Sequence, residues 1–161
     1  MDIPETPDKK RLAEEPGKPA PLETDEVITA VRLLLTGSTI EDIDNKRIIN
    51  NAVEFLENPT EKPEETLPHL LGIGMILAMN YGEIEDQPPV LNEINHRLFI
   101  LISEQHIKII ESELKKEKID TEKIDASIKS ALNFTGVLVK SYSESVLRNR
   151  VIDLQEQLES M

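Results

Sequence analysis

The sequence predicts an all-α protein with a small N-terminal helical bundle followed by a long antiparallel αα-hairpin. Apolar residues recur at steps of three and four along most of the chain, which is the spacing of one face of a helix. Hydrophobic residues make up 39% of the 161 residues but aromatic residues only 3%, so the core must be aliphatic. Two polar segments that contain prolines, 59–66 and 81–89, divide this apolar pattern into units.

The charge balance is strongly acidic, with 31 Asp and Glu against 18 Lys and Arg and a net charge of −13. Such a surface repels phosphate groups unless its basic residues gather on one face, so nucleic acid and anionic membranes are disfavoured as partners. Cysteine is absent, which excludes disulfides, thiolate nucleophiles and cysteine metal sites in this chain.

The most apolar run, 67–79, is about 13 residues long, whereas a membrane-spanning helix needs about 20. The first residues contain no apolar segment that would make a secretory signal. We therefore expect a cytoplasmic protein without membrane contact.

Residues 1–23 contain five prolines and mixed charges but almost nothing apolar. Such a segment cannot bury enough surface to offset the entropy lost on ordering, so we predict a disordered leader. The basic cluster Lys9–Arg11 leaves open a tail that binds a partner, next to the simpler interpretation of a solvated leader.

The N-terminal bundle is predicted over 24–83. Its first helix begins at Thr24 or Asp25, whose side chain can accept an amide hydrogen of the first turn, and Gly37 suits its C-terminal end. Ser38 and Glu41 then match a capping box, which predicts a second helical stretch to about Asn58, with a break possible near 44–45.

The helices of this bundle also allow a helix-turn-helix as an alternative interpretation. The exposed face of its last helix would then contact DNA through Lys46, Arg47, Asn50 and Asn51. Glu54 and Glu57 follow these residues, and short helices joined at a glycine are common in ordinary bundles. We therefore favour an ordinary helical turn.

The next helix, from about Glu64 to Tyr81, is apolar on nearly all sides, which predicts burial from several directions. Gly72 and Gly74 indicate close approach of neighbouring helices, because no strand precedes them and no Lys follows as in a phosphate-binding loop. The acidic, proline-containing segment 84–89 is predicted to be a linker.

The hairpin is predicted over 90–161. One helix spans about Val90 to Lys116, and a second spans about Asp125 to Glu159 and would be roughly 50 Å long at about 1.5 Å per residue. Asp120 or Asp125 can cap the second helix. Two such helices leave much of their apolar surface uncovered, so either the N-terminal bundle or other copies of the chain must cover it.

Self-association through the second hairpin helix is the function that these patterns favour. The apolar stripe rotates by about one residue near Val146, so its two halves should face different neighbours. Arg148 and Arg150 would set the register against acidic neighbours. The residues predicted to mediate self-association are Leu132, Val139, Tyr142, Val146, Leu147, Val151, Leu154 and Leu158.

The end of this helix, from Tyr142 through Arg148 and Arg150 to Leu158, resembles closing helices of phage and mobile-element proteins. In those proteins an Arg–apolar pair precedes a Leu-x-x-x-Leu end. Some are small terminase subunits, which join an N-terminal helix-turn-helix to a helical hairpin that builds a ring. The resemblance covers about 30 residues and implies DNA recognition or packaging as the alternative function.

The carboxylates are scattered over solvent faces, and no pair stands out as an acid–base couple. Glu93 and His96 share a helical face as in di-iron bundles, but those proteins use the motif twice and no second copy occurs here. Ser143 and Ser145 lack a glycine-rich elbow and a nearby His. We expect no enzyme, no cofactor and no metal site, and a partner that is the chain itself or another protein.

Overall fold

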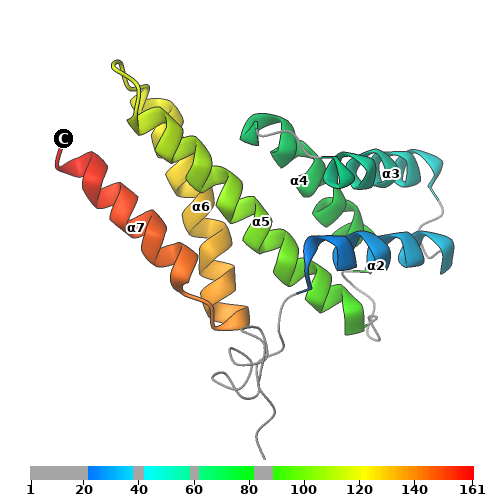
Figure 1. Cartoon of the computed structure of the whole chain (residues 1–161). Helices are drawn as coiled ribbons and strands as arrows, with labels where there is room; N and C mark the ends of the chain where they lie inside the picture. The colour runs from blue at the N-terminus through cyan, green and yellow to red at the C-terminus, as the bar shows by residue number, and fades with distance from the viewer. Residues whose placement is uncertain (1–21, 38–41, 59–61, 82–88) are drawn as a thin grey trace, which may run out of the picture.

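The structure is a computed structural model that describes residues 22–37, 42–58, 62–81 and 89–161. Within these ranges the chain forms six helices and no strand, which confirms the all-α fold class (Figure 1). Residues 1–21 of the predicted leader, the Ser38–Glu41 capping box and nearly all of the linker lie outside the described residues. The helices are α2 (Thr24–Gly37), α3 (Ile43–Glu57), α4 (Pro63–Tyr81), α5 (Pro89–Leu114), α6 (Thr121–Tyr142) and α7 (Val146–Glu159).

Helix α5 lies between two groups of helices, with α2, α3 and α4 on one side and α6 and α7 on the other (Figure 1). The first group packs around a core of aliphatic side chains that α5 completes, including Leu70, Ile73, Ile94 and Leu98. The second core joins another side of α5 to α6 and α7, and its buried members are Ile107, Ile110, Ile124, Ile128, Ala131, Val151 and Leu154.

The burial of α5 decides one alternative that the sequence left open. Its residues Leu91, Ile94 and Leu98 belong to the core of the N-terminal helices and are at most 3% exposed. The N-terminal bundle therefore covers this part of the apolar surface of α5. Helix α5, which we assigned to the predicted hairpin, contributes to both cores.

Local capping explains where several helices begin. The Asp42 side chain accepts a hydrogen bond from the Asn45 amide at 3.0 Å and so caps α3, while Asp120 caps α6 in the same way through Lys123. Helix α2 begins at Thr24, one of the two predicted starts, but the Glu26 carboxylate makes the described capping bond by accepting from the Glu23 amide.

The prediction of one continuous helix from Asp125 to Glu159 is wrong. Helix α6 ends at Tyr142, Ser143 adopts a left-handed conformation with φ 57°, and α7 begins at Val146. The chain then turns back, so that α7 packs against both α6 and α5 (Figure 1). The C-terminal part is therefore a three-helix unit, and the rotation of the apolar stripe near Val146 marks the position of the break.

None of the helices in the described ranges is both long enough and apolar enough to cross a membrane.

Truncation of a side chain in the second core should show that α7 packs within its own chain. We expect Leu154→Ala to lower the free energy of unfolding by about 2–5 kcal/mol, because Leu154 is only 2% exposed. Val146→Ala is the matched control on the same helix, since Val146 is 79% exposed, and it should change stability by less than about 0.5 kcal/mol. Urea unfolding at two protein concentrations measures both. A loss for Leu154→Ala no larger than that for the control would contradict this packing.

Candidate functional site

The residues predicted to mediate self-association lie mostly inside the chain. Val151 and Leu154 are buried in the second core, and three further leucines of the set pack against its edge: Leu132, Leu147 and Leu158. Val139 and Val146 remain exposed, at 39% and 79%. The structure thus brings most of this set together, but it does so between helices of one chain.

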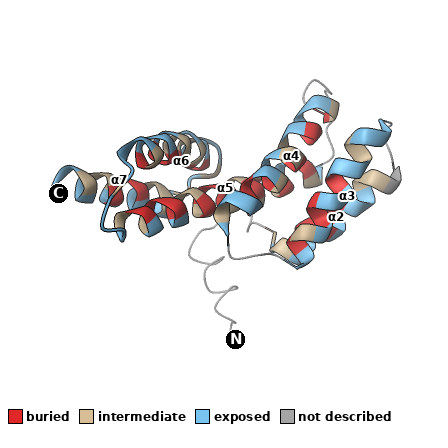
Figure 2. Cartoon of the chain, turned by 90° about the horizontal axis from the view of Figure 1, so that it is seen from above, coloured by how far each residue is buried: buried red, intermediate tan, exposed pale blue. Residues whose placement is uncertain are grey.

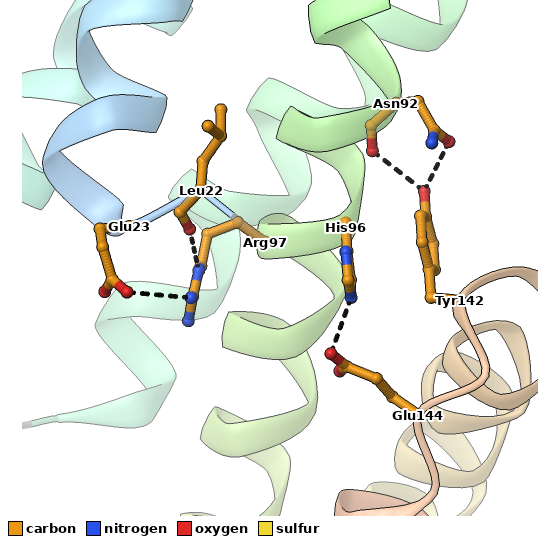
Figure 3. A network of polar contacts seen from close by, with 7 residues as sticks. All are labelled: Leu22, Glu23, Asn92, His96, Arg97, Tyr142 and Glu144. Carbon is orange, nitrogen blue, oxygen red and sulfur yellow. Dashed lines mark hydrogen bonds and ion pairs between the residues drawn. The ribbon is translucent and has the colours of Figure 1, made fainter. Parts of the chain in front are cut away.

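The turn between α6 and α7 is held by polar contacts to α5 (Figure 3). The Tyr142 hydroxyl donates to the Asn92 carbonyl oxygen or side-chain oxygen, which lie 3.2 and 3.1 Å away. The Tyr142 ring stacks on His96 with ring centroids 4.1 Å apart, and partial burial raises the pKa of Tyr142. These contacts fix the end of α6 against the beginning of α5.

The carboxylate beside His96 comes from Glu144, in the turn itself. The distance from His96 Nε2 to Glu144 Oε1 is 3.1 Å, close enough for an ion pair, although the approach lacks the geometry of a hydrogen bond (Figure 3). The Glu93–His96 motif is not part of a larger group of metal ligands, because the described residues hold no cluster of three or more His, Asp or Glu suited to a metal ion. We interpret His96 and Glu144 as a structural pair.

Two arginines of α7 were predicted to set the register of an assembly, and both make contacts within the chain. Arg150 forms an ion pair with Glu111 of α5 at 2.6 Å. Arg148 instead donates to the carbonyl oxygen of Leu132 at 3.0 Å. A Cβ atom at Gly136 would lie 3.3 Å from the Arg148 guanidinium, so the glycine makes room for this contact.

The candidate DNA-facing residues lie on one side of α3, which is a single unbroken helix. Arg47, Asn50 and Asn51 are exposed and Lys46 is partly exposed. The guanidinium of Arg47, however, forms an ion pair with Asp44 at 2.8 Å, and Glu54 is exposed on the same helix. This surface therefore carries charges of both signs, and such a surface attracts a phosphate backbone only weakly.

Helix α4 carries an exposed apolar surface that the sequence did not predict. We expected this helix to be buried from several sides, and for one side that prediction is wrong: Leu71, Met75 and Met79 are 41%, 62% and 70% exposed. Helix α4 packs on α3 and α5, which leaves its outer side uncovered by these neighbours (Figure 2). We call this side the α4 face and define it by its exposed residues Pro68, Leu71, Met75, Ala78 and Met79.

The α4 face differs from the rest of the chain in charge. From Thr66 to Tyr81 the sequence contains no Asp, Glu, Lys or Arg, although 30% of the whole chain is charged. At the junction with α3, Ile48 is 45% exposed and extends the apolar surface, lying 3.4 Å from where a Cβ of Gly72 would be. Contiguous exposed apolar surface of this kind marks interaction sites in soluble proteins.

Helix α5 also holds polar side chains whose ionisation is disturbed by burial. Burial raises the pKa of Glu104, against the opposing influence of Arg97 and Lys108, and burial lowers the pKa of His106. The hydroxyl of Ser103 and Nδ1 of His106 have no described hydrogen-bond partner, but Ser103 is 0% exposed and no substrate could reach it. We see no catalytic arrangement in this group.

Comparisons of the chain with protein-family models, with curated proteins and with solved structures found no match. The resemblance of the C-terminal helix to small terminase subunits therefore stays a prediction. Among the described surfaces, the α4 face best fits an interaction function.

The ionisation of His106 should make stability depend on pH. Because its pKa in the folded chain lies below the usual 6.5, the unfolded chain binds this proton first as the pH falls. The free energy of unfolding should therefore be highest above about pH 6.5 and should fall as the pH is lowered through the folded-state pKa. His106→Gln should remove this part of the dependence in urea unfolding at a series of pH values.

Glu104 should make stability depend on pH in the direction opposite to His106, and Glu104→Gln tests this. The pKa of Glu104 is raised above 4.5 in the folded chain, so its contribution favours folding at low pH and is lost as the pH rises through the folded value. The variant should therefore gain stability over the natural chain towards neutral pH. If the free energy of unfolding changes with pH in the same way for the natural chain and for both variants, these assignments are wrong.

Proposed function

We propose that this chain is a non-enzymatic helical interaction protein that assembles with copies of itself through contacts between helices. The observation that carries the proposal is the α4 face, where Leu71, Met75 and Met79 present an exposed apolar stripe without charge. Covering such a stripe removes apolar surface from water, at about 25 cal/mol per Å². Assembly through helices is thus supported by a surface other than the C-terminal stripe, which is mostly buried.

The acidic balance of the chain limits how copies can meet. Each copy carries a net charge of −13, and like charges facing one another across an interface oppose association. An uncharged contact surface avoids that opposition. The α4 face meets this requirement, whereas the exposed sides of α3 and α7 carry several carboxylates, including Asp44, Glu54, Asp153 and Glu156.

DNA recognition, the alternative function, has less support. It depends on Lys46 and Arg47, and the structure pairs Arg47 with Asp44 on the same helix. A duplex would therefore have to displace this exposed ion pair and approach an acidic chain.

The test is the native mass by light scattering over a range of concentrations at low and high salt. We expect a mass above the 18.2 kDa of one chain that rises with concentration. Added salt should leave the mass unchanged or increase it, because salt screens the repulsion between acidic copies while an apolar contact persists. A mass of one chain at every concentration and salt level would refute self-assembly.

A further inference from the structure

We infer that two copies of the chain pair through their α4 faces, in antiparallel orientation, across a two-fold axis that passes close to Met75. The inference rests on the proposed self-assembly and names the surface and the symmetry of the contact. It predicts a closed dimer, since a surface that contacts its own copy across a two-fold axis leaves no equivalent surface free for a third chain.

The spacing of the exposed residues suits a two-fold contact. Leu71, Met75 and Met79 follow one another at four-residue steps, so each lies about 6 Å from the next along the helix. Met75 is the middle residue of the stripe. An axis near Met75 brings it against the partner's Met75 and brings Leu71 against the partner's Met79, so that the whole stripe is covered in one contact.

The chemistry of the stripe fits an identical partner better than a charged one. An acidic protein selects a basic partner through complementary charge. The stretch from Thr66 to Tyr81 contains no carboxylate that could attract such a partner. An uncharged apolar surface is the matching partner, and the second copy supplies one. Methionine side chains are flexible and polarisable, which lets two such surfaces adjust to each other.

The placement of charge on α4 favours the antiparallel orientation. The acidic residues of this helix, Glu64 and Glu65, both lie in its first turn, and Glu64 is also paired with Lys123 at 3.2 Å. Glu65 is paired with Lys62 at 3.9 Å, so lysines offset part of this charge. A parallel pair would still place the four carboxylates of the two copies close together. An antiparallel pair around Met75 separates the two Glu64 residues by roughly 33 Å along the helix axis, and it also opposes the two helix dipoles favourably.

Single cysteines test this geometry cleanly, because the natural chain has none. Under mild oxidation Met75→Cys should form a disulfide dimer with itself, since a disulfide needs Cβ atoms about 3.5–4.5 Å apart. Leu71→Cys alone should cross-link poorly, whereas a mixture of Leu71→Cys and Met79→Cys chains should yield the mixed dimer. Val146→Cys is the control for random collision, being exposed on α7 and outside the α4 face.

Two results of the cross-linking would overturn the inference. If Met75→Cys forms no more disulfide dimer than Val146→Cys, then the α4 faces do not meet at this residue. If Leu71→Cys cross-links with itself as efficiently as Met75→Cys, then the helices do not pair in the antiparallel register around Met75.

Light scattering of glutamate variants separates this inference from the proposed function. Met75→Glu should abolish the dimer by placing like charges at its centre, and Val146→Glu should leave the mass unchanged. If the natural chain assembles but Met75→Glu has the same mass, self-assembly stands and the α4 contact is wrong. If the natural chain is a monomer throughout, both the function and the contact are wrong.

Discussion

The burial of α5 on two sides is the constraint on which the rest of the structure depends. One side of this 26-residue helix supplies Ile94 and Leu98 to the first core, and another supplies Ile107 and Ile110 to the second. A helix with two buried sides has little surface left for polar residues, so some of them become buried as well. His96, only 3% exposed, is one of these, and it lies against Tyr142 and Glu144 at the turn into α7.

Helices α4 and α5 are both rich in apolar residues, yet α4 keeps one apolar side exposed. Helix α4 packs on α3 and α5, and its surplus apolar surface is therefore exposed on the side away from them. On a chain with a net charge of −13, the α4 face is thus an apolar surface without charge. The lack of charge and the exposure of apolar side chains thus both distinguish the α4 face.

Signals that act within a few residues could be predicted from the sequence, and contacts between distant residues could not. The all-α class follows from periodicity, and local hydrogen bonding narrowed the start of α2 to Thr24 or Asp25 and the cap of α6 to Asp120 or Asp125. The contact between Tyr142 and Asn92 joins residues 50 positions apart and has no local signature. The exposure of Met75 was missed because apolar content indicates that a helix can be buried, but not which of its sides a neighbour will cover.

The break at Ser143 shows why a local pattern gave the wrong helix. No Gly or Pro occurs at 143–145, and a serine in the left-handed conformation costs roughly 1–2 kcal/mol. Burying Val151 and Leu154 gains about 1.5–3 kcal/mol for each side chain, which exceeds that cost. A continuous helix would avoid the cost at Ser143 but would carry both side chains away from the second core. Because the chain turns back, the C-terminal stripe is used to complete its own fold, and the surface left for assembly is on α4.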